Sequence, residues 1–165
     1  MSPTSLVEIG GVRQPMSEQD TFTPEEWRTL QFGPFWVFSA VIGAYNRFDQ
    51  RDYRVFMRCL EAVATSPGRL GREVVTSVVA DLEGLTREYG RDTRTIGVGL
   101  GQVSALLDRA GEDEGLRVKG MLVSEIGEGV ARARGRYGEE MSEDDAGSLA
   151  LAAQLLSFDV EFSDD

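Results

Sequence analysis

Apolar residues recur along most of this chain three or four positions apart, which is the spacing of one helix face. Stripes of this kind predict helices at about 23–31, 34–45, 50–64, 70–88, 96–107, 116–134 and 142–156. No segment combines the alternating pattern of a sheet strand with hairpin turns. The sequence therefore predicts an all-α fold, a single-domain bundle of about seven helices.

Local signals indicate where the first helices begin and end. Thr23, Pro24 and Glu26 are typical of a capping box that starts a helix. Gly33-Pro34 is expected to end that helix and to open the next one, 34–45, which is apolar nearly all round and therefore central and buried. The expected organisation is a flexible N-terminal arm at 1–22, a helical domain at 23–157 and an acidic C-terminal tail at 158–165.

Two parts of the chain share one design. Segments 41–60 and 126–156 each read as an apolar helix, a loop bearing Gly, Asn or Arg, an acidic helix start and a second apolar helix. This repetition predicts two pseudo-repeated helical hairpins within the bundle.

The charge balance excludes several function classes. The 165 residues include 17 Lys+Arg, 28 Asp+Glu and no His, so the net charge is 17 − 28 = −11. Without His there is no Ser-His-Asp or Cys-His catalytic arrangement and no imidazole metal ligand. Strong acidity also argues against nucleic-acid binding, which depends on clustered positive charge. We find no catalytic constellation and expect a protein that is not an enzyme.

The sequence also carries signals of location. Cys59 is the single cysteine and has apolar neighbours at helical spacing, as expected of a small buried residue in a reducing compartment. The first 20 residues lack the pattern of a secretory signal. The longest apolar run, at 35–45, is far shorter than the roughly 20 residues that span a bilayer. We expect a cytoplasmic protein without membrane insertion.

Acidic residues gather at two predicted helix starts. Asp49 and Asp52 mark the first, and Glu139, Glu143 and Asp145 belong to the second. Grouped carboxylates suit a hard divalent cation such as Ca²⁺, Mg²⁺ or Mn²⁺, although neither loop has EF-hand spacing. The alternative is that these acids only cap their helices and complement the helix dipole.

Glycines and aromatic residues have structural interpretations. Gly97 and Gly101 lie four apart on one predicted helix face and indicate close helix packing, and Gly127 and Gly129 indicate the same for a later helix. The first third of the ordered chain is rich in aromatic residues, namely Trp27, Phe32, Phe35, Trp36, Phe38 and Phe48. We interpret them as a core around the second helix. The alternative is a partner-binding patch with Trp27 as its anchor.

The two hairpins resemble the TerB-like tellurite-resistance family over about residues 35–157. In the second half, Ile126-Gly127, Gly135 and Ser142 with the acids that follow it match the family pattern of a helix, a glycine-bearing loop and a Ser/Thr before an acid. In the first half Asp52 stands at the family's Glu position, whereas Asn46-Arg47 replaces its Asp-Gly. The second loop is therefore the better candidate metal site.

The resemblance implies a roughly seven-helix domain, an association with metal or tellurite stress, and divalent cation binding at the acidic loops. The expected function is a non-enzymatic stress-response module of this kind. The alternative is a ligand-free interaction scaffold that binds a protein partner through an aromatic patch or forms a homodimer through glycine-rich helix faces.

Overall fold

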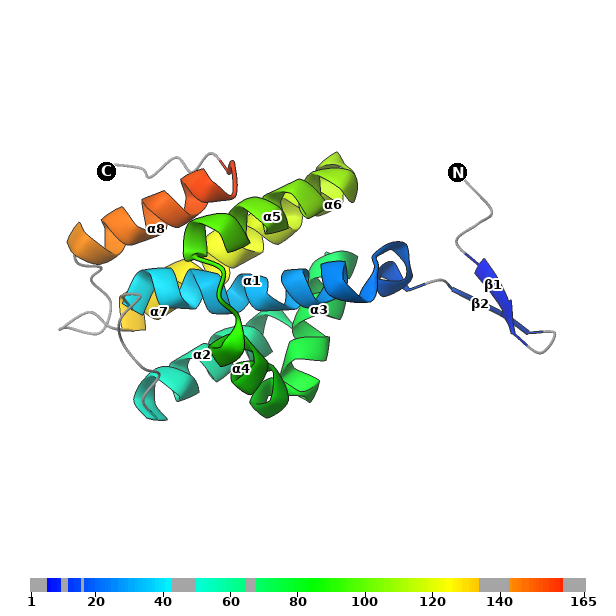
Figure 1. Cartoon of the computed structure of the whole chain (residues 1–165), viewed down its shortest axis with the longest axis horizontal. Coiled ribbons are helices and arrows are strands. Elements are labelled where there is room, and N and C mark those ends of the chain that lie inside the picture. Colours follow the sequence, from blue (N-terminus) through cyan, green and yellow to red (C-terminus); the bar gives the residue numbers. More distant parts are fainter. Residues whose placement is uncertain are drawn as a thin grey trace.

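Seven helices form the body of the chain in a computed structural model, which describes residues 6–9, 12–15, 17–42, 50–64, 68–133 and 143–158 (Figure 1). They are α1 (Pro24–Ile42), α2 (Gln50–Val63), α3 (Arg69–Ala80), α4 (Leu82–Arg91), α5 (Ile96–Arg109), a long helix made of α6 (Glu112–Gly120), the π-helical segment η3 (Met121–Gly127) and α7 (Glu128–Ala133), and α8 (Glu143–Leu155). A 3₁₀ turn, η2 (Glu18–Thr21), precedes α1. The prediction of an all-α bundle of about seven helices is confirmed.

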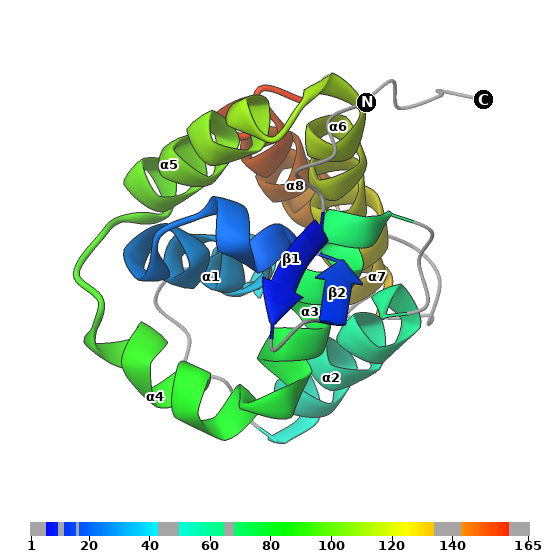
Figure 2. The same ribbon diagram turned by 90° about the vertical axis from the view of Figure 1, so that its right-hand side faces the viewer.

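Helix α1 lies at the centre of the bundle. It contacts α3, α4, α5, η3, α7 and α8, and Figure 2 shows α5 and α4 on opposite sides of it. Its middle residues are fully buried, with Phe35, Val37 and Phe38 at 0% exposure. The predicted central buried helix is therefore confirmed.

The predicted break at Gly33-Pro34 is wrong, because α1 continues through both residues. A proline inside a helix removes one backbone hydrogen bond and costs about 3 kcal/mol when nothing compensates it. Phe32, Phe35 and Trp36 on either side are buried among neighbouring helices. Burial of these large side chains outweighs the local loss, so the two predicted helices are one.

The predicted helix 70–88 is divided into α3 and α4. The division lies at Asp81, whose backbone leaves the helical region with φ −136° and ψ 43°. The change of direction places Leu82 and Leu85 in the core and brings Tyr89 against α1, where its ring stacks on Phe35 with centroids 5.1 Å apart. Both α3 and α4 contact α1.

Glycines allow close approach between helices, but not at every position predicted. A Cβ on Gly99 would lie 2.2 Å from Trp36 Cε2, whereas Gly101 has open space and Gly97 only ordinary contacts. The close packing predicted for Gly97 and Gly101 is thus wrong, and Gly99 between them provides it. The predicted role of the other pair is confirmed, since a Cβ on Gly127 would lie 2.5 Å from Leu149 Cδ1 and one on Gly129 3.0 Å from Cys59 Sγ.

A small β-hairpin precedes the bundle and was not predicted from the sequence. Strands β1 (Leu6–Ile9) and β2 (Val12–Pro15) pair antiparallel, with Ile9 opposite Val12 and Leu6 opposite Pro15. Each strand has only four residues, too few for a clear alternation of apolar and polar positions. Figure 1 shows the hairpin beyond the η2 end of the bundle, apart from the helices.

Candidate functional site

The predicted acidic site falls mostly outside the described residues. Asp49 and Glu139 lie outside them altogether. Asp52 lies in α2 and Asp145 in α8, but their side chains are not among those described. Glu143 is the first residue of α8 and is exposed. The grouping of these five acids therefore stays a prediction.

The helices that flank the two predicted acidic segments meet at one end of the bundle. Figure 1 shows the C-terminal ends of α1 and α7 and the N-terminal ends of α2 and α8 together, at the left of the view. The contacts agree, because α7 packs against α1, α2 and α8. The described helix ends that flank both predicted loops thus lie on the same side of the molecule.

Beneath this end the four helices are closely packed. Gly127 at the end of η3 faces Leu149 of α8 and Val37 of α1, and Gly129 of α7 faces Cys59 of α2. Burial raises the pKa of the Cys59 thiol, so the thiol stays protonated at neutral pH. Cys59 acts here as a packing residue, as its apolar neighbours predict.

Within the described segments, no three His, Cys, Asp or Glu side chains stand close enough together to hold a metal ion. Of the five predicted ligands, only Glu143 has a side chain within those segments.

The aromatic residues form a core around α1, and this prediction is confirmed for those that the structure describes. Trp27 is 4% exposed and Trp36 1%. Phe32, Phe35, Trp36 and Tyr89 contact one another with ring centroids 5.1–6.1 Å apart. Because these rings are almost fully buried, they serve as core residues.

Arg94 attaches the connection between α4 and α5 to this aromatic core. Its guanidinium carbon lies 4.8 Å from the centroid of the Trp36 ring, and its Nη1 donates to Thr29 Oγ1 at 2.9 Å. Asp92 accepts from Arg94 Nη2 at 2.7 Å and from Arg94 Nε at 3.0 Å. The side-chain hydrogen bond from Arg94 lowers the pKa of Asp92 despite partial burial.

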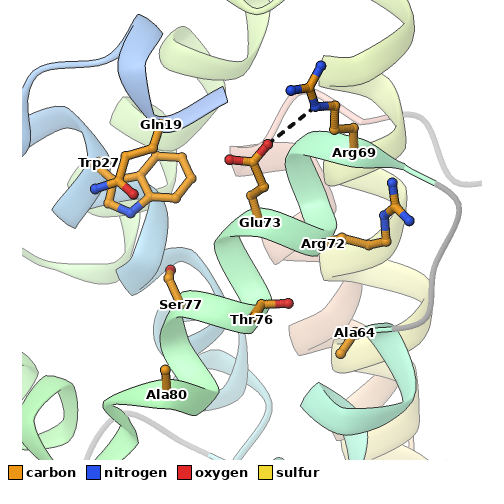
Figure 3. Close-up of a pocket in the computed structure, with 9 residues that line it drawn as sticks. All are labelled: Gln19, Trp27, Ala64, Arg69, Arg72, Glu73, Thr76, Ser77 and Ala80. Atoms are coloured by element: carbon orange, nitrogen blue, oxygen red, sulfur yellow. Dashed lines mark ion pairs between the residues drawn. The ribbon is translucent and has the colours of Figure 1, made fainter. Parts of the chain in front are cut away.

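A groove of about 570 Å³ lies along α3, next to Trp27 near the start of α1. Figure 3 shows α3 in the middle, with Gln19 of η2 and Trp27 of α1 on one side and Ala64 after α2 on the other. The groove is lined by Gln19, Trp27, Ala64, Arg69, Arg72, Glu73, Thr76, Ser77 and Ala80.

Glu73 in the groove already has an ion-pair partner and a hydrogen-bond partner. Both of its carboxylate oxygens accept from the Glu18 backbone N–H at 3.0 Å, and Arg69 Nε lies 3.4 Å from its Oε2. These contacts attach η2 to α3 and set the position of one groove wall.

Comparison with protein-family models, with curated proteins and with solved structures finds no match for this chain. None of the helices in the described segments combines the length and apolar character that crossing a bilayer requires.

Sequence reasoning did not identify the groove. The trace of the groove in the sequence is a row of polar residues at positions 69, 72, 73, 76 and 77. This polar stripe lies on the helix face opposite the predicted apolar stripe. A polar stripe alone predicts only a solvated helix face. One wall comes from residues about 50 positions away in the sequence, as the Glu18–Glu73 hydrogen bonds show.

Proposed function

We propose that this chain is a non-enzymatic, TerB-like stress-response module of the cytoplasm that binds a divalent cation through its two acidic inter-helix loops. The main support is the meeting of four helix ends on one side of the bundle (Figure 1). A bundle in which both acidic segments leave from the same side allows carboxylates distant in sequence to serve one ion. The resemblance in the Ile126-Gly127 and Ser142 segments adds independent support.

The donor chemistry fits a hard cation. Glu139, Glu143 and Asp145 would hold the ion, with Asp49 and Asp52 as a second set. Carboxylate oxygens are the preferred ligands of Ca²⁺, Mg²⁺ and Mn²⁺, and the chain offers no His that would select a softer transition metal. The ion would supply positive charge that offsets repulsion among the carboxylates and so stabilises the loops.

Metal-dependent thermal unfolding of the full chain tests this proposal. After removal of metal with a chelator, millimolar Ca²⁺, Mg²⁺ or Mn²⁺ is expected to raise the melting temperature. An ion present at a hundred times its Kd stabilises the folded state by about 2.7 kcal/mol. We expect Asp145→Asn and Glu143→Gln each to reduce this rise, because each removes one anionic ligand.

Asp113→Asn is the matched control. Asp113 is exposed in the first turn of α6, so it has the same helix-start position as the proposed ligands but lies on another helix. The control should keep the full metal-dependent rise. If no metal changes the melting temperature, or if Asp113→Asn and Asp145→Asn reduce the rise equally, the acids only cap their helices and the metal proposal is wrong.

The scaffold alternative predicts loss of a partner in the Trp27→Ala variant. Trp27 is buried, so this substitution would remove core packing and would not report on binding alone. Light scattering of the unmodified chain over a range of concentrations tests for a homodimer without this complication.

A further inference from the structure

We propose that the outer face of α8 is a contact surface between two copies of this chain, which dock antiparallel with Leu151 of each copy against Gly147 of the other. Helix α8 lies on the outside of the bundle and packs against α1, α5, η3 and α7 (Figure 1). The proposal does not rest on the metal proposal, because the contact requires neither a bound ion nor a carboxylate.

The outer face of α8 lacks charged side chains over most of its length. After the acids at the start of the helix, segment 146–158 contains no Asp, Glu, Lys or Arg, although 27% of the whole chain is charged. The exposed residues of α8 in this segment are Gly147, Ala150, Leu151 and Gln154. Two copies that each carry a net charge of −11 repel each other, so they approach most easily where neither presents an acid. The centre of a protein interface is typically depleted of charged residues in the same way.

The same surface carries exposed apolar side chains. Leu151 is 54% exposed and Val98 of α5 is 50% exposed, and these are two of the three large hydrophobic side chains that are exposed in the described part of the chain. Val98 lies next to the contact between the two helices, because a Cβ on Gly97 would lie 3.8 Å from Leu155 Cδ2. Segment 96–107 of α5 has no charged residue either, so the uncharged surface continues from α8 onto α5.

Gly147 has no packing role within a single copy. A Cβ at this position would meet no described atom within 4 Å. Its φ is not positive, so the backbone there does not require glycine. Glycine inside a helix is destabilising relative to alanine. Close approach of another molecule to the bare backbone gives a reason for glycine at this position.

A second copy fits this surface because a protruding side chain and a bare position lie on it four residues apart. Leu151 and Gly147 are therefore neighbours on one face of α8. When two α8 helices run antiparallel about a twofold axis at the level of Leu149, Leu151 meets Gly147 of the other copy. Symmetry repeats the same contact on the other side of the axis.

The acids at the start of α8 favour the antiparallel direction. Glu143 is the first residue of the helix, and Asp144 and Asp145 follow it. A parallel pair would bring the two acidic starts together. An antiparallel pair separates them by about 20 Å along the helix axis, at a rise of about 1.5 Å per residue.

Sedimentation velocity and light scattering of the full chain over a wide range of concentrations test the proposal. A chelator in every sample removes divalent ions, so failure to dimerise and failure to bind metal are distinguishable. The mass should rise from the 18.1 kDa of one chain to twice this value. Dimerisation should be stronger in about 0.1 M NaCl than in about 0.01 M, because salt screens the repulsion between the copies.

Leu151→Glu should weaken self-association roughly tenfold or more, because it places like charges in the contact. Gly147→Leu should also weaken it, since the bare position is filled. In dilute samples Gly147→Leu should not lower the melting temperature, because leucine is the better helix former. Leu116→Glu is the matched control. Leu116 is 48% exposed but lies on α6, outside the proposed contact, so this variant should still dimerise.

Engineered cysteines test the direction of the pair, in chains that also carry Cys59→Ala. A mixture of Leu151→Cys and Gly147→Cys variants should form a disulfide between copies under mild oxidation, because the two positions face each other. The Leu151→Cys variant alone should not. The proposal is overturned if the chain stays monomeric at every concentration, or if Leu151→Glu dimerises as well as Leu116→Glu. Cross-linking of Leu151→Cys with itself in place of Gly147→Cys would contradict the antiparallel arrangement.

Discussion

A single missing side chain controls how closely α5 approaches α1. Gly99 lies against the flat of the Trp36 indole, with three ring atoms within 2.5 Å of the position a Cβ would take. A methyl group cannot occupy that space unless the helix or the ring moves, and both are part of the closely packed core. Close packing therefore requires glycine at position 99, although glycine within a helix carries an entropic cost.

We predict that Gly99→Ala lowers the free energy of unfolding by about 1–3 kcal/mol, the usual effect of overpacking a core. Gly101→Ala provides the control two residues along the same helix, where a Cβ has no neighbour within 4 Å. That substitution should raise the free energy of unfolding by about 0.5–1 kcal/mol, because alanine is the better helix former. Urea denaturation measures both. Equal effects of the two variants would contradict the described contact between Gly99 and Trp36.

At the scale of elements, the short connection between α4 and α5 depends on one ion pair. Asp92 and Arg94 pair within this connection, and Arg94 reaches the aromatic core of α1 through Trp36 and Thr29. The side chains are 17% and 25% exposed, so the pair is better shielded from solvent than most surface pairs. It holds α5 in the orientation in which Gly99 meets Trp36.

This arrangement predicts a pH-dependent stability. Arg94 lowers the pKa of Asp92 in the folded state. The stabilisation is therefore present above the ordinary aspartate pKa of about 3.9, and it is lost as the pH falls through the lowered pKa. At pH 7 we expect Asp92→Asn to reduce the free energy of unfolding by about 1 kcal/mol. Below pH 4 the difference between the variant and the unmodified chain should shrink.

The exposed pair Arg87–Glu83 is a suitable comparison for Asp92→Asn. These side chains are 67% and 89% exposed and 3.8 Å apart. Glu83→Gln should change the free energy of unfolding by less than about 0.5 kcal/mol at any pH, since exposed pairs contribute little. A constant difference between Asp92→Asn and the unmodified chain down to pH 2 would show that ionisation of Asp92 is not the cause.

At the scale of the whole molecule, the periodic pattern predicts the number and approximate place of the helices, because each helix buries one stripe. It does not predict features that depend on partners distant in sequence. The continuity of α1 through Pro34 depends on neighbours that cover both sides of the helix. The bend at Asp81 depends on the surface of α1, and the groove depends on η2 lying against Glu73. The predicted acidic site stays a prediction, since most of its side chains lie outside the described residues.

The net charge of −11 predicts that the whole molecule is sensitive to salt. The net repulsion that results from 28 acids against only 17 basic residues acts over a Debye length of about 30 Å at 0.01 M salt but only about 10 Å at 0.1 M. Raising NaCl over this range at pH 7 should therefore raise the melting temperature, by roughly 2–4 °C for each 1 kcal/mol gained. Near the sequence pI of about 4.5 the net repulsion vanishes and the effect should disappear. If the rise persists at that pH, general charge repulsion is not its cause.

The metal titrations therefore need at least 0.1 M NaCl, where any further rise reflects binding of the divalent ion.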